Sequence, residues 1–272
     1  ETDGKISGDA FVFTNVPPVF IEPASGKTRG KLEAAMMYDK RQCAECADPM
    51  PIIGQLQASG INVANIRYVD PRSDEGRSLI AKYGLVAVPT IIVSGDTELY
   101  PAFKAAPIGT VEKDGAFVFR KIQPPYFDVI KNRVTGLIRM ISLTDKSCAD
   151  CYDAGKHKTI LTQTFGVKLV SEKTVDASSS EGRALIRQYS IAALPTVIIS
   201  PEAEAYADLI TAWKGVGSVE KDGWLVFRKM DALGQETYKD LKTGTVIRPA
   251  SASASSTGVA AATADDMAGH HP

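Results

Sequence analysis

All four cysteines of this chain lie in two short motifs that could carry thiol chemistry. The motifs are Cys43-Ala-Glu-Cys46 and Cys148-Ala-Asp-Cys151. A Cys-x-x-Cys pair can bind zinc, form a structural disulfide or exchange disulfides with other thiols. With no cysteine left over, we expect each pair to close on itself, Cys43 with Cys46 and Cys148 with Cys151.

An apolar run broken by one proline follows each motif at a similar distance. The runs are Val86-Ala-Val-Pro89-Thr90 and Ala192-Ala-Leu-Pro195-Thr196. This combination, which occurs twice, resembles the thioredoxin superfamily, in which a Cys-x-x-Cys opens a helix and a cis-proline loop packs beside it. The resemblance implies that Pro89 and Pro195 are cis. With Thr90 and Thr196, they would then present a backbone edge to a bound peptide substrate.

The resemblance also implies roles for the four cysteines. Cys43 and Cys148 would be nucleophiles at helix N-termini, where unpaired N–H groups and the helix dipole stabilise a thiolate. Cys46 and Cys151 would resolve the mixed disulfide.

The residues inside the motifs oppose a strongly acidic thiol. Glu45 and Asp150 place a carboxylate beside each nucleophile, which costs a thiolate roughly 1–2 kcal/mol. We therefore expect stable disulfides, with potentials nearer the roughly −270 mV of thioredoxin than the roughly −120 mV of a strong oxidant. Such disulfides fit a reductase-like role or a structural one.

Other interpretations of the polar residues stay open. A shared four-cysteine zinc site is disfavoured because the two pairs fall in separate repeats. His157 is expected at the surface rather than as a ligand. Asp39 and Asp145 precede the motifs and could assist proton transfer, but a turn or capping role is favoured. We expect no metal and no cofactor.

The sequence repeats itself with a period near 106 residues. Glu75–Tyr83 recurs as Glu181–Tyr189, and Val111–Lys121 recurs as Val219–Lys229. This is the length of one compact domain and exceeds the roughly 20–50 residues of a solenoid unit. We predict an N-terminal extended arm (1–30), a first domain (31–122), a linker (123–136), a second domain (137–231) and a C-terminal extension with a Ser/Ala-rich tail (232–272).

Strand and helix patterns alternate within each repeat. Strands are expected at 32–38, 61–69 and 91–93, and then at 137–143, 167–175 and 197–199. Helices are expected at 74–83, which Gly84 would end, and at 181–189, where Ser178-x-x-Glu181 offers a capping box. The alternation predicts an α/β fold of two tandem thioredoxin-like three-layer domains, with parallel strand pairing. After Pro195 the chain departs from that pattern, because residues 202–213 look helical before the strand 224–227.

Composition excludes some functions and favours one compartment. The 31 basic and 32 acidic residues form no cationic block, so nucleic-acid binding is not expected. The longest apolar stretches are nine residues, too short for a membrane span. Two close cysteine pairs favour an extracytoplasmic location, whether periplasmic, cell-surface or secreted. The start at Glu1 is consistent with a processed export precursor or a trimmed chain.

The connecting segment between the repeats occurs three times. Residues 115–136 have an echo at 8–30 and a weaker one at 224–244. A linker unit retained by duplication explains the pattern. The sharper alternative is an edge strand that pairs with another subunit. The tail after Pro249 cannot bury enough apolar area to order itself. The arm or the tail could therefore hold a homo-oligomer or filament together.

Two functions follow from these observations. The leading hypothesis is an extracytoplasmic thiol–disulfide oxidoreductase-like protein that exchanges disulfides with protein thiols, or with a redox partner, through both Cys-x-x-Cys sites. The competing hypothesis is a non-catalytic structural subunit of a cell-surface or extracellular assembly, whose cysteine pairs are structural disulfides.

Overall fold

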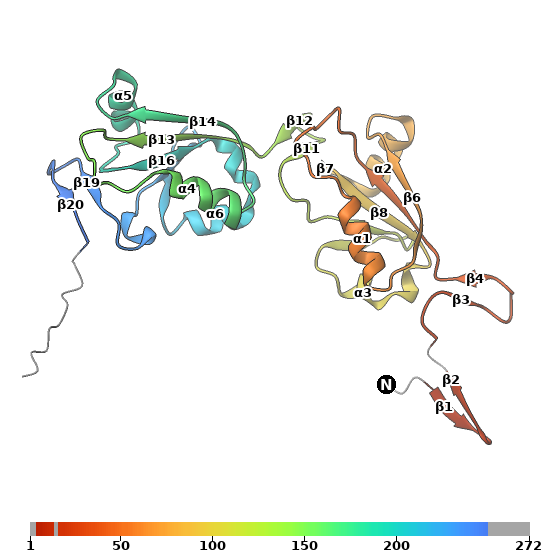
Figure 1. Ribbon diagram of the computed structural model, residues 1–272. Coiled ribbons are helices and arrows are strands. Elements are labelled where there is room, and N and C mark those ends of the chain that lie inside the picture. Colours follow the sequence, from red (N-terminus) through yellow and green to blue (C-terminus); the bar gives the residue numbers. More distant parts are fainter. Residues whose placement is uncertain (1–3, 14–15, 250–272) are drawn as a thin grey trace, which may run out of the picture.

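A computed structural model describes residues 4–13 and 16–249, which form two α/β halves in sequence (Figure 1). Each half is built on a five-stranded mixed sheet. The strand order is β6-β5-β8-β10-β9 in the first half and β14-β13-β16-β18-β17 in the second. The shared order fits the tandem organisation that the duplication predicts. The predicted tail lies outside the described residues.

The elements of the first half follow the expected order. They are β5 (Leu32–Met37), α1 (Met50–Ala58), β6 (Val63–Val69), α2 (Asp74–Tyr83), β7 (Ala87–Val88), β8 (Thr90–Gly95), η1 (Thr97–Leu99), α3 (Pro101–Ala105), β9 (Gly109–Val111) and β10 (Phe117–Phe119). Strand β5 is parallel to β6 and antiparallel to β8.

The second half repeats this order with one added π-helical turn. Its elements are β13 (Leu137–Thr144), α4 (Gly155–Thr159), the π turn η2 (Ile160–Thr164), β14 (Lys168–Asp176), α5 (Ser180–Gln188), β15 (Ala193–Leu194), β16 (Thr196–Ile199), η3 (Pro201–Ala205), α6 (Ala207–Trp213), β17 (Gly217–Val219) and β18 (Leu225–Phe227). The predicted strands and helices are confirmed. The helical stretch expected after Pro195 is present as η3 and α6.

Each sheet is buried on both faces, which gives the three layers. Alternate side chains of β5 enter different clusters: Ala34 and Met36 face one, and Ala35 and Met37 the other. Helices α1 and α3 cover the first face, and α2 covers the second. The period-2 alternation of a strand therefore becomes two separate cores.

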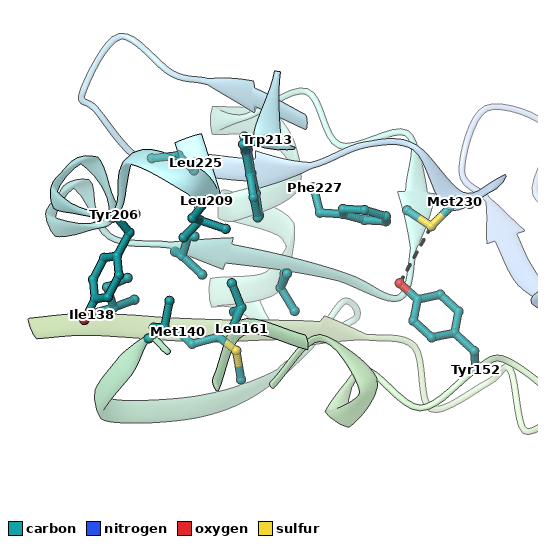
Figure 2. Packing of buried hydrophobic residues seen from close by; sticks show 14 residues of the cluster. Ile138, Met140, Tyr152, Leu161, Tyr206, Leu209, Trp213, Leu225, Phe227 and Met230 are labelled. Atoms are coloured by element: carbon teal, nitrogen blue, oxygen red, sulfur yellow. Dashed lines mark hydrogen bonds between the residues drawn. The ribbon is translucent and has the colours of Figure 1, made fainter. Parts of the chain in front are cut away.

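In the second half, helix α6 supplies most of the larger core. Leu209 and Trp213 are buried against residues of β13 and β18, as Figure 2 shows. Tyr206, at the start of α6, is also buried, and its hydroxyl donates to the Gly136 carbonyl at 2.7 Å. Burial of each such side chain stabilises the fold by roughly 1.5–3 kcal/mol. The helix that departs from the plain thioredoxin pattern is thus a core element.

Small hairpins flank the large sheets. Three of them are β3 (Phe20–Ile21) with β4 (Thr28–Arg29), β11 (Tyr126–Asp128) with β12 (Arg133–Thr135), and β19 (Tyr238–Asp240) with β20 (Val246–Ile247). A fourth joins β1 (Gly4–Ser7) to β2 (Ala10–Phe13). The described residues of the N-terminal arm therefore contain two hairpins. Among the described residues, no helix combines the length and apolarity needed to cross a bilayer.

The helix caps correct one sequence expectation. The side chain of Ser179, and not that of Ser178, accepts the Gly182 N–H at 2.9 Å and starts α5. The hydroxyl of Ser178 instead donates to the Asp176 carboxylate, which also accepts the Ser178 N–H. Asp176 thus holds Ser178 in the preceding turn, one residue before the cap. Ser73 caps α2 in the same way, and Gly84 ends that helix in the left-handed region, as expected.

This capping pattern predicts different effects for two adjacent substitutions. Ser179→Ala should lower the free energy of unfolding by about 1 kcal/mol, because it leaves a helix N–H without its acceptor. Ser178→Ala, the matched control, should lower it by less than about half as much, because it removes only an exposed hydrogen bond to Asp176. Urea unfolding followed by circular dichroism measures both, and equal losses would contradict the assignment of the cap.

Candidate functional site

Both cysteine pairs are closed disulfides, as the sequence predicts. Cys43 is bonded to Cys46 and Cys148 to Cys151, with Cα–Cα distances of 5.3 Å and 5.4 Å. No cysteine is left free, so in this structure all four sulfur atoms are engaged in disulfides and none is available to a shared zinc site. Within the described part of the chain, no cluster of three or more His, Cys, Asp or Glu side chains could hold a metal ion.

The motifs do not open helices, and that expectation is wrong. Cys43–Cys46 lies in a turn, in which the Cys46 N–H donates to the Cys43 carbonyl at 3.3 Å. Helix α1 begins only at Met50, after Pro49, and α4 begins only at Gly155. The effect of a helix dipole fades beyond the terminal turn. Neither Cys43 nor Cys148 therefore gains the thiolate stabilisation that the resemblance implies.

The disulfides are also largely covered. Cys43 is 5 % exposed, Cys46 6 % and Cys148 9 %. Only Cys151 is partly exposed. Disulfide exchange requires a thiolate to approach a sulfur atom along the bond axis, so a covered disulfide reacts slowly. The geometry of the first pair is that of a protected cross-link.

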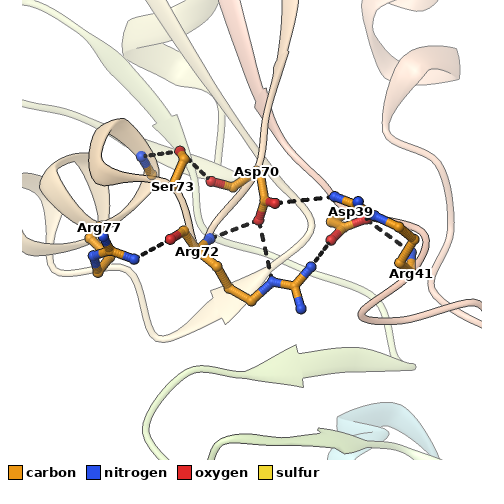
Figure 3. Close-up of polar contacts among 7 residues, drawn as sticks. Asp39, Arg41, Asp70, Arg72, Ser73 and Arg77 are labelled. Carbon is orange, nitrogen blue, oxygen red and sulfur yellow. Dashed lines mark hydrogen bonds and ion pairs between the residues drawn. The ribbon is translucent and has the colours of Figure 1, made fainter.

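Asp39 anchors the turn that carries the first disulfide, and Figure 3 shows the contacts of its side chain with Arg41 and Arg72. Its carbonyl accepts the Cys43 N–H at 3.2 Å, and its carboxylate accepts the Arg41 N–H at 3.0 Å. The carboxylate is also paired with the side chains of Arg41 and Arg72, and Asp70 completes the group. Hydrogen bonding to Arg41 lowers the pKa of Asp39. The favoured turn role of Asp39 is confirmed.

Asp145 does the same in the second half with different partners. Its carboxylate accepts the Ser147 N–H at 2.8 Å and lies 2.6 Å from Nζ of Lys239 on β19. The bond to Lys239 lowers the pKa of Asp145. The turn with the second disulfide is thereby joined to the last hairpin of the chain.

The carboxylates inside the motifs are not free, which alters the electrostatic expectation. Glu45 lies 2.9 Å from Nζ of Lys168, and Asp150 lies 2.7 Å from Arg248. A paired carboxylate repels a nearby thiolate less than an isolated one, because the cation offsets its field. The expected penalty on the thiolates is therefore reduced, although surface pairs of this kind contribute little to stability.

The two prolines are cis, as predicted, but the backbone edge before each one is occupied. In β7, Val88 pairs with Phe127 of β11, and in β15, Leu194 pairs with Lys239 of β19. The resemblance assigns this edge to a substrate peptide. In both halves the chain's own hairpin takes that place.

The threonines after the prolines are core residues. Thr90 and Thr196 are buried, and their hydroxyls donate to the carbonyls of Phe119 and Phe227 at 2.5 Å and 2.6 Å. These bonds tie β8 to β10 and β16 to β18. The substrate-binding role of Pro89, Thr90, Pro195 and Thr196 stays a prediction, as does the catalytic role of the four cysteines.

His157 is buried, and the expectation of a surface histidine is wrong. It is 4 % exposed, its ring lies edge-on to Phe227, and its Nε2 is 2.9 Å from the Tyr152 hydroxyl. That hydroxyl donates to the Pro195 carbonyl at 2.7 Å, so the histidine ring can donate to the tyrosine oxygen. Burial lowers the pKa of His157 to about 4. A lone histidine in the sequence gave no indication of these partners.

The two halves differ at this point. In the first half, the residues at the corresponding distances from the motif are Ala47 and Ile52, and a cleft of about 290 Å³ lies there beside Pro89. In the second half, Tyr152 and His157 pack beneath Pro195. The first half thus has a cleft where the second has a hydrogen-bonded tyrosine–histidine pair.

A scan of protein families and a search of curated proteins both give no match to this sequence. The functional argument therefore rests on the geometry of the two disulfides and of the strands around the cis-prolines.

The buried histidine predicts a specific loss of stability in acid. Unfolded, His157 binds a proton near pH 6.5; folded, it does so only near pH 4. The stability that the neutral His157 side chain contributes to the fold is fully present above pH 6.5 and is lost as the pH falls toward 4. The unfolding free energy should drop by about 3 kcal/mol over that window relative to His157→Phe. Urea unfolding at a series of pH values measures the difference, and parallel curves for the two proteins would contradict it.

Proposed function

We propose that this chain is a thioredoxin-like scaffold of an oxidising, extracytoplasmic compartment, in which the Cys-x-x-Cys pairs are structural disulfides. The pairing of β11 with β7 and of β19 with β15 carries the proposal. A thioredoxin-like enzyme needs the edge before its cis-proline to hold a substrate. Here both edges hold segments of the chain itself.

The surroundings of the disulfides support the same function. Cys43 and Cys148 are covered and precede their helices by several residues. A nucleophilic cysteine needs solvent access and stabilisation of its thiolate. Cys43 and Cys148 are covered, and neither lies at the start of a helix. A disulfide that closes a four-residue loop still stabilises a fold by about 2 kcal/mol in the chain-entropy account.

The scaffold function matches the way the halves are joined. Hairpin β11–β12 pairs with the first half and continues directly into β13 of the second. Cross-linked domains connected by such a hairpin are suited to a cell-surface or extracellular assembly, where disulfides persist.

A redox function is the second candidate, and one observation favours the second half for it. Cys151 is partly exposed, and its Sγ is 3.9 Å from the Leu194 carbonyl, next to Pro195. If either disulfide exchanges with protein thiols, we propose that it is Cys148–Cys151.

The scaffold proposal predicts slow exchange and a stabilising role. With reduced glutathione at pH 7, the Cys43–Cys46 disulfide of the native protein should open at least about a hundredfold more slowly than in urea. The double variant Cys43→Ala, Cys46→Ala should lose about 2 kcal/mol of unfolding free energy. Alkylation with mass spectrometry and urea titration measure the two effects.

The matched variant Cys148→Ala, Cys151→Ala reports on the second half separately. The redox candidate would be established if the wild-type protein catalyses the reduction of insulin and this variant does not. Loss of stability in both variants, without turnover, supports the scaffold.

A further inference from the structure

The first hairpin of the chain repeats the hairpin that closes each large sheet. Gly4 pairs with Phe13 in β1–β2, Gly109 with Phe119 in β9–β10, and Gly217 with Phe227 in β17–β18. The next pairs, from Lys5 with Val12 onward, keep this register. Residues 4–13 thus correspond in sequence and register to the last two strands of a five-stranded sheet.

The second hairpin repeats the linker in the same manner. Phe20 pairs with Arg29 in β3–β4, as Tyr126 pairs with Thr135 in β11–β12. A glycine follows each hairpin, and its carbonyl accepts a tyrosine hydroxyl, Gly30 from Tyr100 at 2.5 Å and Gly136 from Tyr206 at 2.7 Å. Hairpin β3–β4 is therefore fixed to the first half as β11–β12 is fixed to the second.

Two consecutive hairpins thus form one unit, which we call the closing segment. It occurs at residues 4–29, 109–135 and 217–247. In the second and third occurrences, its first hairpin pairs with the strand after a cis-proline, β8 or β16, and its second with the strand before it, β7 or β15. Each of these segments completes the half that precedes it in the chain.

The first closing segment pairs with neither of the two described halves. Among the described strands, β2 pairs only with β1, and β3 only with β4. Val12 is 42 % exposed, whereas Val118 and Val226, at the same register position, are 0 % exposed. Ile21 is 67 % exposed, whereas its counterpart Phe127 packs against the core around Val88. The apolar residues for closing a sheet are present without the sheet.

We propose that residues 4–21 complete the sheet of another domain of this same fold, one whose cis-proline strands lack closing hairpins of their own. Strand β2 would pair antiparallel with the strand after that domain's cis-proline, and β3 with the strand before it. The partner domain could lie in the same polypeptide or in another. The proposal does not depend on whether the disulfides exchange.

A second intact copy does not fit this role. Its β8 and β16 edges are covered by β10 and β18, and its β7 and β15 edges by β11 and β19. Pairing with such a copy would break an existing hairpin contact for each one formed. An open sheet offers unpaired N–H and C=O groups, which strand addition satisfies without that loss.

A graft within the full chain tests whether the first hairpin can close this sheet. Residues 109–119 are replaced by residues 4–13, and the control graft carries Val12→Asp. The plain graft should keep the thermal midpoint of the first half within about 5 °C of the wild type. The control should lower it by at least twice as much, because a carboxylate would be buried in the sheet. A plain graft as unstable as the control would overturn the proposal.

A binding experiment tests the pairing between chains. The acceptor is the full chain without residues 1–15, with residues 109–119 replaced by a Gly/Ser linker of equal length. The wild-type chain should form a one-to-one complex with it in sedimentation velocity, and Val12→Asp should weaken the complex by about a hundredfold. A folded acceptor that binds neither chain would overturn the proposal, and if the acceptor does not fold, the graft decides. Self-association of the wild-type chain alone, abolished by Val12→Asp, would make a second copy the partner and also overturn it.

Discussion

The backbone pairing at the strand before each cis-proline is the interaction on which the rest of the structure depends. Strands β7 and β15 are only two residues long, yet each receives a hairpin that arrives from the end of its own half. This pairing satisfies backbone groups that would otherwise form an exposed edge. It also fixes where the next element starts, because β12 leads through Gly136 straight into β13. One contact thus seals a potential substrate edge and sets the connection between the halves.

The disulfide turns depend on the same hairpins through their charges. In the second half, Lys239 of β19 bonds to Asp145, and Arg248, just after β20, pairs with Asp150 inside the motif. Moving the hairpin away from β15 would therefore leave two carboxylates near the disulfide without their cations. In the first half, Asp39 pairs with Arg41 and Arg72, which both belong to that half. The two disulfides thus have similar turns but are coupled to the closing segments to different degrees.

The sequence was sufficient for the regular elements and insufficient for the site. Period-2 and period-3.6 patterns, reinforced by duplication, predicted the strands β5, β6, β8, β13, β14, β16 and β18, helix α2 and its end at Gly84, but not the edge strands β9 and β17. The family resemblance failed at the motifs because a helix start depends on local hydrogen bonds, here from the Met50 N–H to Asp48 and from the Gly155 N–H to Asp153. The burial of His157 was missed because it depends on Tyr152, Pro195 and Phe227, which meet only in the folded chain. Likewise, the sequence showed that the connecting segment occurs three times, but only the strand register showed which strands each copy pairs with.

The strand register shows that the closing segments occur three times, whereas the structural unit that each one closes occurs twice. One complete structural unit starts at β5 or β13 and ends with the closing segment that follows it, at 109–135 or 217–247. The described residues therefore contain two complete units, preceded by a further closing segment at 4–29. Val12 and Ile21 of the first closing segment are exposed, whereas Val118 and Val226 are buried and Phe127 is partly buried at the corresponding register positions. In this arrangement the closing segment that pairs with neither described half lies before β5, whereas β19 and β20 close the strand β15 of the second half. The closing segments at 109–135 and 217–247 pair with the strands beside the cis-prolines, so among the described strands only the segment at 4–29 lacks such a pairing.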